Sequence, residues 1–270
     1  MAEAVLLSVV TAVFGGDDVT ILLAAALVAA GAVLQALFVR ADRAGAYGRA
    51  AVLKGCAALA FVLVGDLGLR AELALAGRDA ARVAPAASMC LGLALGAVGD
   101  VLHALRFVLP SRKRLLFNVG AVTFLLGHLA YLAAVVPACG CRAWGAVASV
   151  ALAFAVDATV LPRIRVQSAV ELAAGGAYLA VTSAVVGFAA AGAAAGVPGG
   201  ATAAVGAAAW PGTAASWLAL AVGTAAFLAS DVMLAVNTFG GLDSPRLRAT
   251  SLGTYYAGQS LIALSLVLAA

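Results

Sequence analysis

Long apolar runs separated by short polar segments dominate the pattern of this chain. Residues 19–38 contain no charged side chain, and an α-helix needs about 20 mostly apolar residues to cross a bilayer. Further runs of this kind follow near 51–67, 84–105, 115–136, 143–161, 169–191, 214–236 and 252–268. The pattern therefore predicts about eight transmembrane helices.

One apolar stretch is too long for a single helix. Residues 172–230 contain no Asp, Glu, Lys, Arg or His, and the segments 198–200 (PGG) and 210–212 (WPG) lie near its middle. Pro and Gly in such clusters interrupt helices, so we expect two spans joined by an apolar loop. The alternation over about ten residues that is typical of a membrane β-barrel is missing. The predicted fold class is all-α: one integral membrane domain over 1–270, built as a polytopic helical bundle.

Composition supports a membrane protein. Hydrophobic residues make up 65% of the chain and charged residues 10%, and the mean hydropathy is +1.11. A soluble domain has about 45–50% apolar and 25% charged residues. This composition excludes a soluble globular protein and a nucleic-acid-binding domain.

The positive charges predict an orientation. Eleven of the 16 Lys and Arg residues follow the odd-numbered runs, namely Arg40, Arg43, Arg49, Arg106, Arg112, Lys113, Arg114, Arg163, Arg165, Arg246 and Arg248. Four lie on the other side, namely Arg70, Arg78, Arg82 and Arg142. The positive-inside rule then places the first group in the cytoplasm and both termini outside. The run 5–14 lacks a basic flank, which argues against a cleaved signal peptide. We expect a multi-pass protein of a bacterial inner membrane or a eukaryotic endomembrane.

Two distant segments resemble each other. The sequence at 99–102 (GDVL) is similar to that at 230–233 (SDVM), and His128 and Gln259 each follow the aspartate of their segment by 28 residues. Four runs separate the copies, so both have the same orientation, as in a parallel four-helix pseudo-repeat. The alternative is chance similarity in a background rich in Ala, Leu and Gly.

Three ionisable residues lie within spans at similar predicted depth, in the cytoplasmic half: Lys54, Asp100 and Asp231. A charge at the bilayer centre costs at least about 2.5–3.5 kcal/mol, so such residues are functional candidates. We expect them to form one buried cluster with compensating charges. The alternative is that Lys54 extends to the interface while the aspartates pair with Arg106 or cap helices. His103 is expected to point toward the lipid headgroups.

Other polar residues could contact a substrate. His128 lies halfway along its span, with Tyr131 one turn further on. Its ring could move a proton or orient a substrate, or it could be a packing residue with both nitrogens satisfied. Tyr178, Tyr255 and Gln259 could hydrogen-bond a polar lipid head, although tyrosines also serve as interfacial anchors.

The remaining residue types predict no further chemistry. Four Cys and two His at unrelated depths do not form a zinc site, and no nucleophile elbow or phosphate-binding loop occurs. We therefore expect neither a metal nor a cofactor. Cys139 and Cys141 could form a disulfide or remain free. The 30 glycines are so abundant that their spacing predicts nothing.

Two stretches resemble the lysoplasmalogenase-like family, also called YhhN. They are 91–136, with LGLALGAVGDVLHAL and FNVGAVTFLLGHLAYLAAV, and 224–266, with FLASDVMLAVNTF and TYYAGQSLIAL. Lys54 occupies the place of that family's lysine at the start of the second span. It is followed here by Gly55 where the family has a proline.

The resemblance implies hydrolysis of the vinyl ether bond of a lysoplasmalogen, a lysophospholipid, to a fatty aldehyde and a glycerophospho-ethanolamine or -choline. An acid protonates the β-carbon of the vinyl ether, and water captures the resulting oxocarbenium ion. Asp100 and Asp231 fit the roles of acid and carboxylate in either order. Lys54 would hold the lipid phosphate. The substrate would enter sideways from the surrounding membrane lipids, with the site on the cytoplasmic side.

The alternative is a protein without enzymatic activity, either a lipid-binding protein or a proton-coupled transporter. Intramembrane Asp and Lys residues together with a parallel repeat are also typical of carriers. Discontinuous helices meeting at the midplane would favour the carrier.

Overall fold

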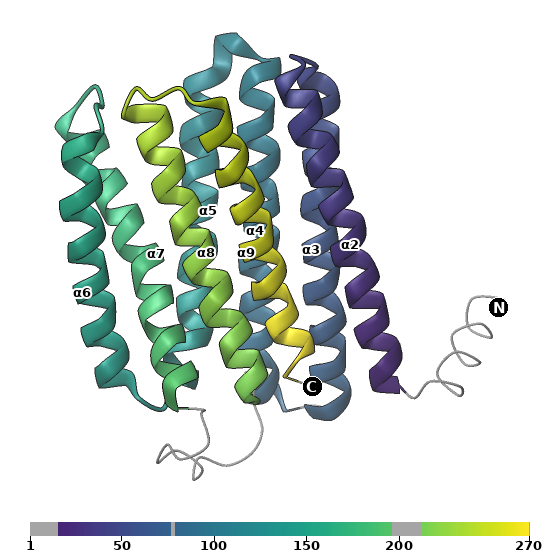
Figure 1. Cartoon of the computed structure of the whole chain (residues 1–270). Helices are drawn as coiled ribbons and strands as arrows, with labels where there is room; N and C mark the ends of the chain where they lie inside the picture. The colour runs from purple at the N-terminus through teal and green to yellow at the C-terminus, as the bar shows by residue number, and fades with distance from the viewer. Residues whose placement is uncertain (1–15, 77–78, 196–211, 270) are drawn as a thin grey trace, which may run out of the picture.

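The computed structural model describes residues 16–76, 79–195 and 212–269, and this part of the chain is an all-α bundle without strands (Figure 1). Its long helices are α2 (Gly16–Arg43), α3 (Tyr47–Ala76), α4 (Ala80–Val108), α5 (Lys113–Ala138), α6 (Arg142–Val160), α7 (Ala169–Ala195), α8 (Ala214–Phe239) and α9 (Pro245–Val267). Two short 3-10 helices, η1 (Pro110–Arg112) and η2 (Leu161–Arg163), follow α4 and α6. The predicted fold class is confirmed.

Each predicted run corresponds to one observed helix, and most helices extend several residues beyond the run. Among the described residues, the seven helices α2 to α8 are long and apolar enough to cross a membrane. The eighth predicted run forms α9, which falls short of the same apolar character. It carries buried polar residues such as Gln259, Ser260 and Ser265. The predicted loop segments 198–200 and 210–211 and the run 5–14 lie outside the described residues.

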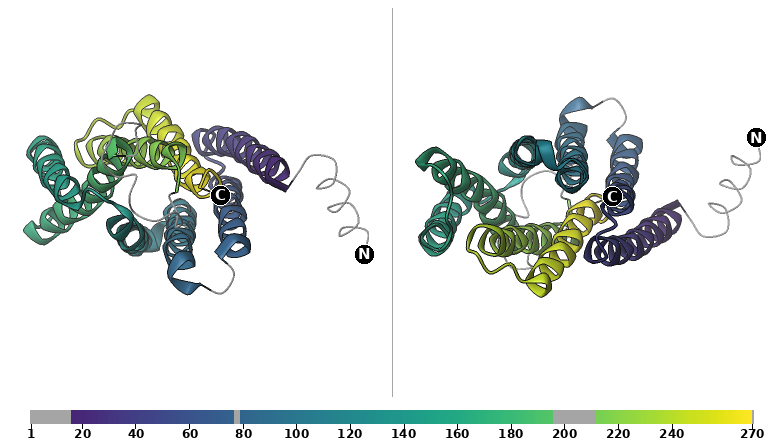
Figure 2. Two further views of the ribbon diagram at one scale, coloured as in Figure 1. Left: turned by 90° about the horizontal axis from the view of Figure 1, so that it is seen from below. Right: turned by 90° about the horizontal axis from the view of Figure 1, so that it is seen from above.

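The order of packing follows the proposed repeat. Successive helices pair, so that α4 packs against α5 and α8 against α9. In addition, α3 packs against α9, and α7 packs against α5. If the first four helices correspond to the last four, these two contacts are equivalent. Views along the bundle show α9 between the α2–α3 pair and α8 (Figure 2).

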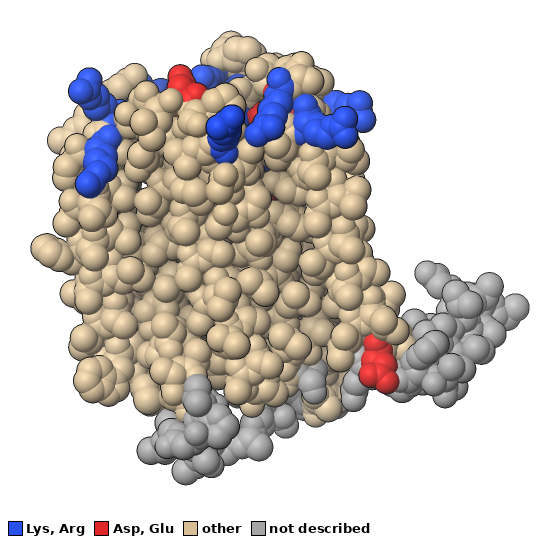
Figure 3. Space-filling model, viewed as in Figure 1, with Lys and Arg blue, Asp and Glu red and all other residues tan. Residues whose placement is uncertain are grey.

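Surface chemistry agrees with a lipid environment. Large apolar side chains point outward along the helices, among them Val52, Leu91, Phe154 and Val170, which are 55–77% exposed. In water such an apolar surface would be unusual for a monomer. In a membrane it is favourable, because the apolar side chains contact lipid chains. Lys and Arg side chains gather at one end of the face shown in Figure 3. The chain is therefore an integral multi-pass membrane protein.

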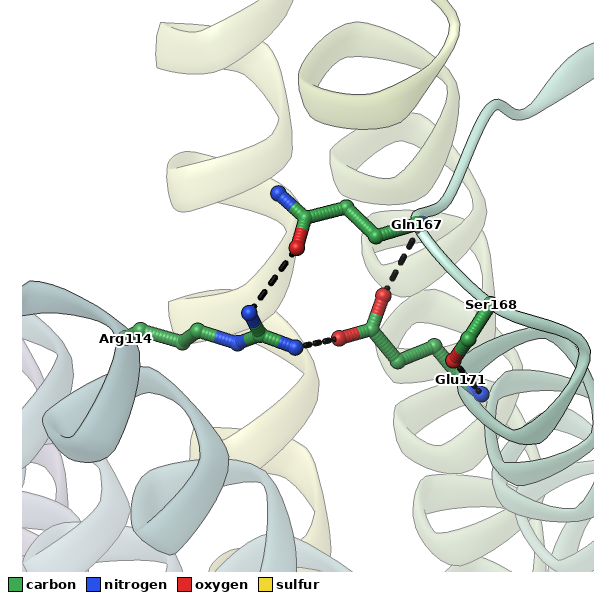
Figure 4. A network of polar contacts seen from close by, with 4 residues as sticks. All are labelled: Arg114, Gln167, Ser168 and Glu171. Atoms are coloured by element: carbon green, nitrogen blue, oxygen red, sulfur yellow. Dashed lines mark hydrogen bonds and ion pairs between the residues drawn. The ribbon is translucent and has the colours of Figure 1, made fainter.

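A network of polar contacts at this basic end ties α5 to α7 (Figure 4). Arg114 forms an ion pair with Glu171 and donates a hydrogen bond to Gln167 Oε1 at 2.8 Å. The backbone N–H of Gln167 donates to Glu171 Oε2 at 3.0 Å, and Ser168 Oγ accepts from the backbone N–H of Glu171 at 3.2 Å. A Ser followed three residues later by a Glu is a helix-capping pattern, so this network fixes where α7 begins.

Two glycines allow the backbones of α8 and α9 to touch. A Cβ atom added at Gly223 would lie 2.9 Å from the carbonyl oxygen of Gly258, and one added at Gly258 would lie 2.8 Å from that of Gly223. Both distances are shorter than real Cβ contacts. Small residues permit such close approach in membranes, where packing replaces the hydrophobic effect between helices.

We expect Gly223→Ala to lower the free energy of unfolding by about 1–3 kcal/mol, because the added methyl group overpacks the α8–α9 contact. Gly253→Ala in α9 is the matched control, since a Cβ there meets nothing within 4 Å. The measurement is thermal unfolding of both variants in detergent. Equal Tm values for the two variants would contradict the close approach.

Candidate functional site

Lys54 of α3 and Asp100 of α4 form a buried ion pair. Lys54 Nζ lies 3.0 Å from Asp100 Oδ1, and the two side chains are 8% and 4% exposed. The ammonium also lies 5.1 Å from the ring centroids of Phe38 and Tyr255, within range of a cation–π interaction. Lys54 therefore points into the bundle and does not extend to the interface, and Asp100 pairs with Lys54 rather than with Arg106.

A line of hydrogen bonds continues from Asp100 across the bundle. The Tyr255 hydroxyl donates to Asp100 Oδ2 at 2.9 Å, and Gln259 Nε2 donates to the Tyr255 oxygen at 3.2 Å. The Tyr131 hydroxyl donates to Gln259 Oε1 at 3.0 Å. All of these side chains are buried. We call this line, from Lys54 through Asp100, Tyr255 and Gln259 to Tyr131, the Asp100 network.

Glycines of α4 make room for the Asp100 network. Gly92, Gly96 and Gly99 are spaced by four and three residues, so they share one helix face. A Cβ at Gly96 would lie 2.7 Å from Gln259 Nε2, and one at Gly99 would lie 2.8 Å from the ring of Phe124. The expectation that glycine spacing is uninformative is wrong here. The available signal was this spacing, which ends beside Asp100.

Asp231 occupies a separate position. The Tyr178 hydroxyl of α7 donates to Asp231 Oδ2 of α8 at 2.8 Å, and Asp231 forms no salt bridge with a described residue. The single cluster of three charges expected from the sequence is therefore two sites. The physical reason is the packing order: α4 and α8 each pack against the helix before them, α3 and α7, and their aspartates bond to residues of these helices.

His128 lies between the two sites. Its Nδ1 is 2.8 Å from the carbonyl oxygen of Phe124 in the preceding turn. Its ring contacts Tyr131 of the Asp100 network and Tyr178 of the Asp231 site, at centroid distances of 5.7 and 5.8 Å. It also packs edge-on against Phe227 at 4.5 Å. The ring contacts of His128 therefore connect the Asp100 network with the Asp231 site inside the bundle.

Aromatic residues that sequence reasoning missed fill the space between these groups. Phe227 lies 5.2 Å from the Tyr255 ring, and Phe124 lies 6.0 Å from it. Phe124 follows Asp100 by 24 residues, as Tyr255 follows Asp231. This equal spacing from the two aspartates is the sequence signal that could have identified Phe124. Phe124 has no hydroxyl group, so the two halves differ where Tyr255 donates to Asp100.

Two further expectations, for His103 and for the two neighbouring cysteines, are settled by geometry. His103 does not point to the headgroups, because its Nε2 lies 3.2 Å from the carbonyl oxygen of Phe117 and its ring stacks on the Phe117 ring at 5.1 Å. Cys139 and Cys141 are free thiols. Over the described ranges, no group of three His, Cys, Asp or Glu side chains is arranged to hold a metal ion.

The chain matches the model of a known protein family. The model of the YhhN family matches residues 69–266, more than half of the chain. The match includes Asp100, Asp231, the residues that bond to them from α7 and α9, and His128, whereas Lys54 precedes it. No curated protein and no solved structure matches the chain significantly.

The buried ion pair should reveal itself as energetic coupling. We expect Lys54→Met to lower the free energy of unfolding by about 3–5 kcal/mol, because it leaves a buried carboxylate without its counter-ion. The double variant with Asp100→Asn should recover most of this loss, since the amide still accepts from Tyr255. Denaturation in detergent measures both. Arg70→Met, which breaks the exposed pair with Asp66, should cost under about 1 kcal/mol. Additive effects of the two buried substitutions would contradict the pair.

Proposed function

The chain belongs to the YhhN family, and we propose that it hydrolyses the vinyl ether bond of lysoplasmalogens inside the membrane, releasing a fatty aldehyde and a glycerophospho-ethanolamine or -choline. The observation that carries the proposal is a pair of intramembrane carboxyl groups with different partners. Asp100 is ion-paired to Lys54, whereas Asp231 accepts a hydrogen bond from Tyr178. Acid–base chemistry at an apolar site needs such a difference.

We assign the proton donor to Asp231. It has no cationic partner among the described residues, so it is the carboxyl group that is free to carry a proton. Transfer of this proton to the β-carbon of the vinyl ether gives an oxocarbenium ion and leaves Asp231 as a carboxylate. Water then adds to the cationic carbon and releases a proton, which restores Asp231. The hemiacetal collapses to the aldehyde and the glycerol hydroxyl.

Asp100 supplies the second requirement, a carboxylate near the positive charge of the transition state. Lys54 and Tyr255 hold its two oxygens at 3.0 and 2.9 Å, so its orientation is fixed before the substrate arrives. Preorganised groups of this kind stabilise charge as it develops. The hypothesis that Lys54 holds the lipid phosphate is less favoured, since its ammonium already pairs with Asp100 and faces two aromatic rings.

Continuous helices support the hydrolase over the transporter. Carriers with a repeat of this kind build their sites from helices that are broken at the midplane. Each described helix from α2 to α9 is continuous. The prolines within α4 and α5, Pro85 and Pro137, lie near the helix ends.

Release of aldehyde from a lysoplasmalogen by the purified protein in detergent tests the proposal. We expect Asp100→Asn and Asp231→Asn each to lower kcat by about 100-fold or more, because general acid–base groups contribute at least that much. Asp66→Asn is the control, since its exposed carboxylate pairs with Arg70 away from both sites. Near-wild-type turnover by either of the first two variants, folded as judged by thermal unfolding, would refute the two-carboxyl mechanism.

Two adjacent tyrosines allow a sharper test. Tyr255→Phe removes the hydrogen bond to Asp100 Oδ2, and we expect kcat to fall about tenfold, the equivalent of one hydrogen bond to a charged group. Tyr256→Phe is the matched control, because among the described residues its hydroxyl makes no hydrogen bond to either carboxyl group. Steady-state rates of aldehyde release measure both. Equal rates for the two variants would exclude a role for the Asp100–Tyr255 contact.

A further inference from the structure

Arg106 is a buried arginine at the basic end of the bundle. It lies in the last turn of α4 and is 8% exposed. Its guanidinium carbon lies 4.8 Å from the ring centroid of Phe107 and 5.2 Å from that of Phe117. The two rings hold the group in place by packing and cation–π attraction. Neither phenylalanine ring carries an oxygen or nitrogen that could accept a hydrogen bond from the guanidinium.

Among the described residues, the guanidinium of Arg106 forms no ion pair. Asp42 acts on it electrostatically, but both oxygens of Asp42 bind Arg248. The Nε of Arg106 is buried and has no hydrogen-bond partner among the described residues. Arg248, which contacts the same Phe107 ring at 4.7 Å, is instead held by both oxygens of Asp42 at 2.9 Å. A buried charge without a partner is costly. The remaining donors of Arg106 therefore point to an anion supplied from outside the chain.

The repeat shows that packing alone does not require an arginine at this position. Arg106 follows Asp100 by six residues, and Asn237 follows Asp231 by six. Asn237 has a structural role, because its Oδ1 accepts a hydrogen bond at 2.8 Å from the backbone N–H of Ser244, the residue that caps α9. Arg106 has no such partner within the described ranges. The first half of the repeat thus carries a charged, unpaired group where the second carries a satisfied amide.

Arg106 lies at a suitable separation from the proposed reaction site. Arg106 follows Asp100 by six positions in α4, which corresponds to about 9 Å along the helix axis. Ring contacts link the two, since Phe117 stacks on His103 and His103 packs against Phe124 at 5.3 Å. In a lysophospholipid, five bonds separate the ether oxygen from the phosphorus. The length of the Arg106 side chain makes up the difference between the separation of Asp100 and Arg106 and that of the ether oxygen and the phosphorus.

Space for a polar head exists at the same end. A surface hollow of about 570 Å³ is lined by Pro162, Arg163, Arg165, Thr238, Phe239, Gly240 and Gly241. Phe239 packs against Phe117 at 5.7 Å, so the hollow adjoins the ring that Arg106 covers. Its arginines add positive charge to the approach of an anion.

We propose that Arg106, with Arg248 beside it, forms a binding site for the phosphate diester of a lysophospholipid. Guanidinium groups bind phosphate through paired N–H donors. A phosphate held at Arg106 would leave the ether bond near Asp100 and the alkenyl chain among the lipid-facing helices. The identity of the lipid rests on the proposed function. The phosphate site itself does not.

Binding without turnover tests this site. The probes are a saturated alkyl-ether lysophosphoethanolamine, which has no vinyl ether to hydrolyse, and the corresponding alkylglycerol, which has no phosphate. We expect the wild-type protein in detergent to bind the phospholipid about tenfold or more tightly than the alkylglycerol, in line with hydrogen bonds to a charged group. Arg106→Gln should abolish this difference, and Arg106→Lys should keep part of it. Arg112→Gln, which removes an exposed charge at the same end, should keep all of it.

Competition identifies the source of the phosphate. Displacement by glycerophosphoethanolamine alone indicates a headgroup site, and equal displacement by inorganic phosphate indicates that free phosphate also binds. Equal affinity of the wild-type protein for both lipids would overturn the proposal, even if Arg106→Gln failed to fold. Retention of the difference by folded Arg106→Gln would also overturn it. Normal binding without any aldehyde release would instead refute the proposed function and leave the phosphate site standing.

Discussion

The pairing of Lys54 with Asp100 inside lipid is the constraint on which the rest of the bundle depends. Neither charge can rely on water there, so each needs partners from neighbouring helices. Asp100 takes one from α3 at 3.0 Å and one from α9 at 2.9 Å. Because Tyr255 must reach Asp100, α9 has to lie inside the bundle next to α3 and α4. This explains why the most polar of the described helices occupies a central position.

Close approach of backbones makes that arrangement possible. Glycines on α4 leave room for Gln259 and Phe124, and Gly223 and Gly258 bring α8 against α9. Larger residues would hold the polar atoms of α9 beyond hydrogen-bonding distance of their partners. In hydrocarbon no solvent would replace the lost hydrogen bonds. The buried polar network therefore depends on the small residues that let the helices approach each other.

The two halves share a packing order and differ in chemistry. Asp100 pairs with Lys54 and accepts a hydrogen bond from Tyr255, whereas Asp231 accepts a hydrogen bond from Tyr178. Tyr255 in one half corresponds to Phe124 in the other by its spacing from the aspartate. A symmetric bundle would give two carboxyl groups with the same surroundings and the same behaviour. Divergence at a few positions gives them different partners, as acid–base catalysis at a single site requires.

Hydropathy by itself determined the fold class and the approximate positions of the eight long helices α2 to α9, because a span in lipid must satisfy its backbone internally and expose apolar side chains. The scarcity of charge within spans also singled out Lys54, Asp100 and Asp231. Only the tertiary structure decided that Lys54 pairs with Asp100 while Asp231 bonds to Tyr178. Depth along a helix can be read from the sequence, but the neighbour that a side chain meets depends on which helices pack together and through which faces.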